Sequence, residues 1–164
     1  MLLYLIRHAH ADSAAEDALR PLSPQGRLAV RRLALGLRSA NVCRSPAAVW
    51  HSPLRRARET AELLVAGLGH SQTPVLTVEG LLPEDDPTLL VPRLWQSTGA
   101  LAIVGHEPFL GSLASYLVTG REMPAVFVVE KGTVLCLERP EENRPSARWR
   151  CHWQVVPEMF PPVI

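Results

Sequence analysis

Two histidines, an arginine and an aspartate follow the first apolar run of the chain. Residues 4–13 have the sequence YLIRHAHADS, which places Arg7 directly before His8, with His10 and Asp12 behind it. A His-x-His-x-Asp spacing can begin a metal site, because imidazole and carboxylate groups are common metal ligands. An arginine beside a histidine suits a phosphoryl group, because the planar guanidinium can bind two phosphate oxygens at once. The two chemistries require different partners elsewhere in the chain.

Two later segments supply the partners of a phosphoryl site. Arg56 lies in HSPLRRARETA, residues 51–61, and His106 lies in VGHEP, residues 104–108. Each segment follows a short apolar run at a strand-to-helix junction, where an open α/β sheet binds ligands and helix N-termini favour anions. Each motif alone is equally compatible with a structural histidine or an exposed helix face. Their coincidence predicts a phosphoryl pocket formed by Arg7, His8, His106 and an arginine of residues 51–61.

A histidine beside arginines also has a chemical use. Neutral imidazole is a good nucleophile towards phosphorus, and a covalent intermediate divides phosphoryl transfer into two easier steps. Arginines spread the charge that develops on the phosphoryl oxygens in the transition state. We therefore expect an enzyme. The alternative is a phosphate-binding module without turnover, although such a module need not keep both histidines and both arginines.

The elements that must position these residues alternate between strand and helix. Short apolar runs predict buried strands at 2–6, 47–50, 75–78 and 100–104. Ser23-Pro24 and Asp86-Pro87 are typical helix starts, with an N-cap followed by proline at the first helical position. The helices are expected at 24 to about 40, 53 to about 68, 87–95 and 108–118.

The last third of the chain is rich in β-forming residues. Runs at 125–129 and 133–138 predict a hairpin that turns at 130–132, followed by a polar hairpin loop at 140–146 and a last strand at 148–156. The proline-rich end is expected to trail over the surface. The whole pattern predicts an α/β fold, a three-layer sandwich with a mostly parallel central sheet and antiparallel edge strands, in a single domain over residues 1–164.

Composition excludes several classes of protein. The 164 residues carry a net charge of +1, which argues against a general binder of nucleic acid or of anionic membranes. No apolar run reaches the roughly 20 residues of a membrane span, and the N-terminal run is too short for a signal peptide. Cys43, Cys136 and Cys151 are odd in number and widely spaced, which fits reduced thiols in a cytoplasmic protein better than a disulfide framework or a zinc knuckle.

Taken together, the motifs resemble those of the histidine phosphatase superfamily, which has the phosphoglycerate-mutase-like fold. Arg7-His8-Ala9 resembles the first motif of the family, Ser52-Pro53-x-x-Arg56-Ala57-x-x-Thr60 the second, and Gly105-His106 the third. Four further stretches resemble the small branch of SixA-type phosphohistidine phosphatases: RPLSPQG at 20–26, LLPEDDP at 81–87, VGHEPFLG at 104–111 and KGTVLCLE at 131–138. The similarity extends from residue 2 to about residue 155.

The resemblance implies a role for each pocket residue. His8 would be the nucleophile that becomes phosphorylated, Arg7 and Arg56 would hold the phosphoryl oxygens, and His106 would stabilise the transition state. Arg55 and Arg58 would be surface residues, because the S-P-x-x-R spacing selects Arg56. The resemblance implies no cofactor and no metal, and a substrate that is either the phosphohistidine of a signalling protein or a small phosphate ester. Two further candidates for substrate contact are His10 and Glu84.

The chain departs from the larger relatives at two places. Ala9 stands where glycine is common, and no residue matches the acid/base glutamate that those relatives carry after the third strand. Of the carboxylates in TVEGLLPEDDP, residues 77–87, we favour Glu84 for a residual acid role, because this loop is expected to pass the pocket mouth. Cleavage of phosphohistidine needs such an acid less than cleavage of an alkyl phosphate, because imidazole is the better leaving group.

Other functions stay open within and outside the superfamily. A phosphoglycerate mutase or a general phosphomonoesterase has the same fold, but 164 residues leave little chain for a lid, and an open pocket suits a protein side chain. A metal-dependent hydrolase would use His8 and His10, as in the H-x-H-x-D-H motif of metallo-β-lactamases. Ser13 stands where the last histidine of that motif should be, and Arg7 beside a cation is electrostatically unfavourable. An amidohydrolase barrel needs about 250 residues.

Overall fold

A computed structural model describes residues 1–141 and 147–163. Within these residues the strands form one six-stranded sheet with the order β3-β2-β4-β1-β5-β6. The strands are β1 (Leu2–Arg7), β2 (Ala48–His51), β3 (Val75–Thr77), β4 (Leu101–Gly105), β5 (Val134–Glu138) and β6 (Arg150–Val155). The first four are parallel, and β5 runs antiparallel to both β1 and β6. The predicted mostly parallel sheet with antiparallel edge strands is confirmed.

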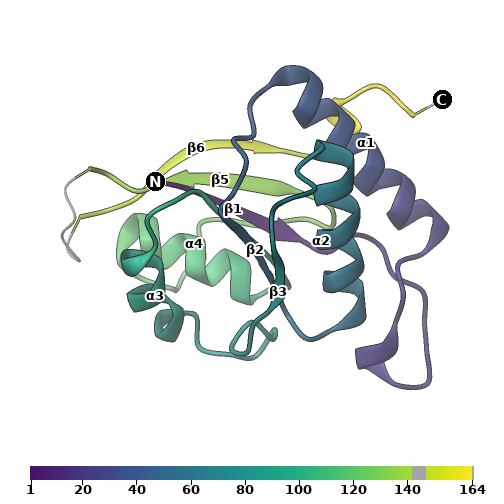
Figure 1. Ribbon diagram of the computed structural model, residues 1–164. Helices are drawn as coiled ribbons and strands as arrows, with labels where there is room; N and C mark the ends of the chain where they lie inside the picture. Colours follow the sequence, from purple (N-terminus) through teal and green to yellow (C-terminus); the bar gives the residue numbers. More distant parts are fainter. Residues whose placement is uncertain (142–146, 164) are drawn as a thin grey trace.

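Helices cover both faces of the sheet (Figure 1). One apolar cluster lies between the sheet and the pair α1 (Pro24–Ala40) and α2 (Arg55–Leu68). A second cluster lies between the opposite face and the pair α3 (Val91–Gln96) and α4 (Phe109–Thr119). All five residues of β4 are buried, as its continuous apolar sequence predicts for a strand that is covered on both sides. The fold is the predicted three-layer sandwich.

Local signals fix the ends of the two long helices. The Ser23 side chain accepts a hydrogen bond from the backbone N–H of Gly26, and Pro24 takes the first position of α1. Asn41 ends α1 in the left-handed conformation, with φ at 52°, and Gly69 ends α2 in the same way. Because these signals need no distant contact, the predicted bounds of both helices are confirmed to within two residues.

The predicted strand at 125–129 is wrong. These residues have no ladder partner within the part of the chain that the structure describes, and β5 pairs instead with β1 and β6. Side chains take the place of a partner strand: Ser115 Oγ accepts from Val126 N at 2.8 Å, and Glu107 Oε1 accepts from Val129 N at 2.6 Å. The turn itself forms, since the Thr133 N–H donates to Glu130 O.

The helix after Asp86 also differs from its prediction. The Asp86 side chain caps the Thr88 N–H as expected, but residues Pro87–Leu90 form a 3-10 helix, η2, and α3 starts only at Val91. Pro92 has no N–H and cannot donate to a carbonyl one turn earlier, so a continuous α-helix from Pro87 is disfavoured at this point.

The C-terminal segment docks onto α1. A short 3-10 helix, η3 (Pro157–Met159), and Phe160 lie against it, and Arg32 donates from Nε to Phe160 O and from Nη2 to Glu158 O. Gly36 leaves the space that the Phe160 ring fills. The prediction that the proline-rich end lies over the surface is confirmed for these residues, which are held against α1. The last strand is confirmed, whereas most of the predicted loop 140–146 lies outside the described residues.

Two predictions made from composition can be compared with the structure. Cys43, Cys136 and Cys151 are all free thiols, so the prediction of no disulfide framework is confirmed. None of the described helices has the length and apolarity that a membrane crossing requires.

Candidate active site

Three strand ends meet at one edge of the sheet. The parallel strands β2, β4 and β1 are neighbours, and their registers place Arg7 beside Gly105 and His51 beside Val104. The next residue of each strand is held there, since His8 N donates to Gly105 O and Ser52 N donates to Val104 O, both at 3.1 Å. The three motifs therefore converge at the carboxyl edge of the sheet, as predicted.

The ring of His8 is held with one nitrogen unprotonated. Its Nδ1 lies 2.7 Å from Ala9 O, which can only accept, so Nδ1 carries the proton and Nε2 keeps its lone pair. Nε of Arg56 donates to Nε2 at 3.3 Å. Burial lowers the pKa of His8 to about 4; Arg56 and Arg7 act in the same direction, and the bond to Ala9 O acts against them. A neutral ring whose Nε2 is unprotonated can act as a nucleophile.

His106 faces His8 across the pocket. The two ring centroids are 4.9 Å apart, and Ser52 Oγ lies 2.5 Å from Nε2 of His106. Burial, together with the nearby His8 and Arg56, lowers the pKa of His106 to about 3, so its ring is neutral at neutral pH. Its Nδ1 is buried and has no hydrogen-bond partner among the described residues. If Ser52 donates to Nε2, Nδ1 carries the proton and can donate to an oxygen bound in the pocket.

Arg56 comes from the first turn of α2 and is 6% exposed. Its Nη1 donates to Asp17 O at 2.9 Å and its Nη2 donates to Asp17 Oδ2 at 3.0 Å. Thr60 links this turn to the residue after His8, because its Oγ1 donates to Arg56 O and accepts from Ala9 N. Arginine and histidine are thus tied to each other through both side chain and backbone.

Arg7 completes the positive side of the pocket. Its Nη1 donates to Val129 O at 3.3 Å, while its buried Nε has no partner among the described residues. The carboxylate of Glu107 holds the segment that carries Val129, because it accepts from both Val129 N and Gly111 N. The unused donors of Arg7 and His106 suit an anion with several oxygens.

Family comparisons agree with this geometry. Residues 3–82 match the model of the histidine phosphatase superfamily, branch 1. An uncharacterized protein of Picosynechococcus sp. is 35% identical over 130 residues, which cover 74% of this chain and 75% of that protein. The chain belongs to the histidine phosphatase superfamily.

Solved structures with the same fold include three phosphatases. The protein histidine phosphatase SixA, complexed with tungstate, matches with a TM-score of 0.80 at 22% identity, over 97% of this chain and 99% of that chain. The protein described as the putative phosphohistidine phosphatase SixA from Agrobacterium tumefaciens matches with a TM-score of 0.74 at 18% identity, over 94% of this chain and 97% of that chain. The alpha-ribazole phosphatase from Shigella flexneri matches with a TM-score of 0.66 at 19% identity, over all of both chains. The phosphoglycerate-mutase-like fold is thereby confirmed.

The superfamily motifs also contain arginines that the structure places away from the pocket. Arg55 is exposed and pairs with Glu59 at 2.7 Å, and Arg58 is exposed and lies 3.8 Å from Glu62. The prediction that these two arginines are surface residues is confirmed, and the role of Arg56 in the site stays a prediction.

The two further candidates for substrate contact lie outside the cluster around His8. His10 is exposed, and its Nδ1 lies 2.8 Å from Oγ of Ser23, at the start of α1. Glu84 is exposed and lines a separate acidic hollow beside Pro108 and Phe109, together with Asp85, Asp86 and Glu122. A contact of either residue with substrate stays a prediction.

Three residues of the site were not predicted. Ser52 and Thr60 are in the second motif, yet their partners, His106 and Ala9, become neighbours only through the sheet register. The S-P-x-x-R-A-x-x-T spacing could have pointed to both. Asp17 lies in a loop with no motif that was recognised, and nothing local indicates that it reaches Arg56.

The geometry does not fit the metal hypothesis. Within residues 1–141 and 147–163, no group of three His, Cys, Asp or Glu side chains is arranged to hold a metal ion.

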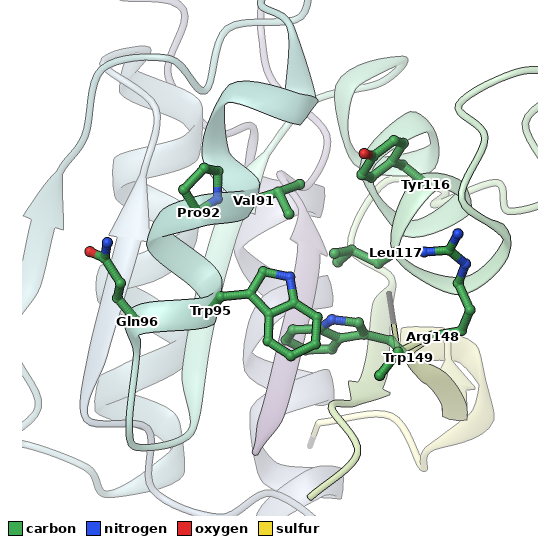
Figure 2. A pocket seen from close by; sticks show the side chains of 9 residues that line it. Val91, Pro92, Trp95, Gln96, Tyr116, Leu117, Arg148 and Trp149 are labelled. Carbon is green, nitrogen blue, oxygen red and sulfur yellow. The ribbon is translucent and has the colours of Figure 1, made fainter. Parts of the chain in front are cut away.

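A cavity of about 470 Å³ lies between α3, α4 and the segment that leads into β6 (Figure 2). Trp95, Tyr116, Leu117, Arg148 and Trp149 are among the residues that line it. Leu117 is near the C-terminal end of α4, whose other end follows His106, so this cavity is remote from the histidine pair. The candidate chemistry is therefore not in this cavity.

Proposed function

We propose that this chain is a phosphatase that forms a phosphohistidine intermediate on His8 and acts on the phosphohistidine of a protein, in a single domain over residues 1–164. The observation that supports it is the unprotonated Nε2 of a neutral His8, which accepts a hydrogen bond from Nε of Arg56 at 3.3 Å. The likeness to SixA structures supports the choice of a phosphohistidine substrate.

The reaction has two transfers. In the first, Nε2 of His8 attacks phosphorus, the P–Nε2 bond forms, and the P–N bond to the substrate ring breaks; that ring carries a proton on its other nitrogen, so it leaves as neutral imidazole. In the second, a water oxygen attacks phosphorus, the P–Nε2 bond breaks, and inorganic phosphate leaves while His8 returns to its neutral form. Neither transfer needs a metal or an organic cofactor, because the charge that develops lies on oxygens facing Arg7, Arg56 and His106.

Access to the pocket supports a projecting side chain as substrate. His8 and His106 are 7% and 2% exposed, so the phosphoryl group must enter past the surface to reach Nε2. A phosphorylated side chain can extend into such a site while the body of its protein stays outside. A small phosphate ester is the second candidate, and the match to alpha-ribazole phosphatase favours testing it. The cytoplasmic location and the signalling partner stay predictions.

The test is a trapping experiment with a matched control. Phosphoryl-labelled substrate, quenched during turnover, should leave label on wild-type protein and on the His152→Ala variant, in which an exposed histidine of β6 is removed. The His8→Ala variant should carry no label, and its turnover should fall by several orders of magnitude with an unchanged melting temperature. Turnover at the wild-type rate in His8→Ala would exclude the mechanism.

A substrate panel separates the remaining alternatives. We expect protein phosphohistidine and a phosphoramidate to be cleaved faster than phosphoserine peptide and phosphosugars. Turnover that is faster on phosphosugars would identify a small-molecule phosphatase or mutase. Binding of phosphate without any turnover would identify a non-catalytic module, and loss of turnover in EDTA would favour the metal hypothesis.

A further inference from the structure

Asp17 bonds the outer end of the Arg56 side chain, and the proposed reaction gives it no role. It lies in a 3-10 turn, η1 (Asp17–Leu19), in the loop between β1 and α1. Its backbone oxygen accepts from Nη1 of Arg56 at 2.9 Å, and its Oδ2 accepts from Nη2 at 3.0 Å. Asp17 therefore accepts a hydrogen bond from each terminal nitrogen of the guanidinium.

The opposite side of the same guanidinium faces the nucleophile. Nε of Arg56 lies 3.3 Å from Nε2 of His8. The Asp17 side chain is 64% exposed and that of Arg56 is 7% exposed, so the arginine lies between a carboxylate on the solvent side and a buried histidine. Because a guanidinium is planar and rigid, fixing its two terminal nitrogens also fixes the direction of the Nε–H bond.

We propose that Asp17 is a positioning residue of the phosphoryl site, which holds Arg56 so that its Nε edge faces the group transferred to His8. The inference rests on the proposed function, because it takes Arg56 to bind that group. Asp17 does not itself touch the reacting atoms.

The surroundings of Asp17 fit this role and not that of a proton donor. Hydrogen bonds from Arg20 and Arg56 lower the pKa of Asp17, so the carboxylate is ionised at neutral pH and has no proton to give. Arg20 also holds the turn, because its Nη1 lies 3.2 Å from Asp17 Oδ1 and its Nε donates to Asp12 O. An ionised carboxylate repels a phosphoryl group, and Asp17 lies at the end of Arg56 that is farther from His8.

The first experiment measures oxyanion binding and turnover in four proteins. Asp17→Ala removes the carboxylate, Asp17→Asn keeps one acceptor oxygen, and Glu16→Ala is the matched control. Glu16 is the exposed neighbour of Asp17 in the same loop, and its side chain makes no capping bond. The Kd of vanadate should rise roughly tenfold in Asp17→Ala and less in Asp17→Asn, with no change in Glu16→Ala.

Steady-state kinetics distinguish the loss of Arg56 alignment from a general disturbance of the loop that carries Asp17. An arginine that is misaligned for the transition state should lower kcat by roughly 10- to 100-fold while KM changes much less. Vanadate binding should weaken more than phosphate binding, because vanadate resembles the transition state more closely. An equal loss in Glu16→Ala, or tighter vanadate binding in Asp17→Ala, would overturn the proposal.

A double-mutant cycle tests the coupling directly. In the Arg56→Ala background, Asp17→Ala should cause no further loss of vanadate affinity, because the side chain that it positions is absent. Fully additive losses would overturn the proposal. Calorimetric binding needs no turnover, so a protein that binds vanadate and shows the coupling without hydrolysing any phosphoryl substrate would disprove the proposed function and still support the role of Asp17.

Discussion

At the scale of single residues, the chemistry depends on which nitrogen of His8 carries the proton. The bond from Nδ1 to Ala9 O determines the tautomer, and burial keeps the ring neutral. Both features come from the turn that follows β1, where the chain leaves the sheet. Backbone geometry therefore sets the tautomer of His8, the proposed nucleophile, before any substrate binds.

We predict that His8 does not titrate in the ordinary range of a histidine. In oxyanion-free buffer, its Cε1–H resonance should stay at the neutral position from about pH 8 to about pH 5, whereas an unperturbed histidine has its midpoint near 6.5. The expectation follows from a pKa lowered to about 4 by burial. The measurement is a histidine-labelled NMR titration, with the His8 signal assigned by its absence in His8→Gln. A midpoint above 6 would contradict it.

The same shift makes stability depend on pH. Between the unfolded pKa of about 6.5 and the folded value of about 4, the unfolded chain binds more protons at His8 than the folded chain does. The free energy of unfolding must therefore fall as the pH falls through this window. The slope of stability against pH should be shallower in His8→Gln, which can be measured by urea unfolding.

How much of the site the sequence could predict also differs from residue to residue. Arg7, His8, Arg56 and His106 carry recognisable motifs, and the structure brings all four together. Ser52 and Asp17 owe their contacts to the sheet register and to the path of a loop, which no local pattern encodes. Asp17 is exposed, and a carboxylate in a polar loop usually has no partner, so sequence alone gave no reason to choose it.

At the scale of elements, predictions succeeded where the signals are local. The cap at Ser23 and the proline after it set the start of α1, and Asn41 and Gly69 end α1 and α2. Residues 125–129 have the composition of a strand but do not become one. β5 occupies the position beside β1, and the backbone of 125–129 is satisfied by side chains of Glu107 and Ser115 instead. Strand pairing is decided by contacts between residues that are distant in sequence, and the β-propensity of a segment carries no information about them.

Glu107 provides a test at this scale. It joins the first turn of α4 to the segment that holds Arg7, through Gly111 N and Val129 N. In Glu107→Gln one acceptor becomes a donor that faces a backbone N–H, so we predict a loss of about 1–3 kcal/mol in the free energy of unfolding. Urea unfolding measures this loss. Glu79→Gln is the control, because Glu79 is exposed and has no hydrogen-bond partner among the described residues. Equal stability of the two variants would disprove the bracing role.

At the scale of the whole molecule, the site exists because three parallel strands end side by side. β2, β4 and β1 are adjacent in space although other elements separate them in sequence, and each contributes its next residue to one edge. Helices cover both faces of the sheet with apolar side chains, so the polar side chains gather at this edge instead. The sequence predicted this convergence because fold class alone implies it. It could not predict how far the four side chains would be buried.

The arrangement of carboxylates around this edge leads to the last prediction. Asp17 is ionised beside Arg56 and Arg20, and Glu84 lies in a separate exposed hollow, so neither is placed as an efficient proton donor to a leaving group at His8. A general acid typically contributes roughly 10²–10⁴-fold in rate, and an alkoxide leaving group needs it while imidazole or an activated phenolate does not. We therefore predict that N–P substrates and aryl phosphates are turned over much faster than alkyl phosphates.

The Glu84→Gln variant tests whether Glu84 acts as a weak general acid or has no part in proton transfer. If Glu84 reaches the leaving group, its loss should slow alkyl-ester cleavage and leave phosphohistidine cleavage unchanged, because only the alkoxide needs its proton. Steady-state kcat/KM on p-nitrophenyl phosphate, phosphoserine peptide and protein phosphohistidine measures the difference. Glu79→Gln again serves as the charge-matched control. Equal efficiency of the wild-type enzyme on phosphoserine and phosphohistidine would reveal an acid at the pocket and would place the enzyme among general phosphatases, because proton delivery would then no longer limit which leaving groups it can release.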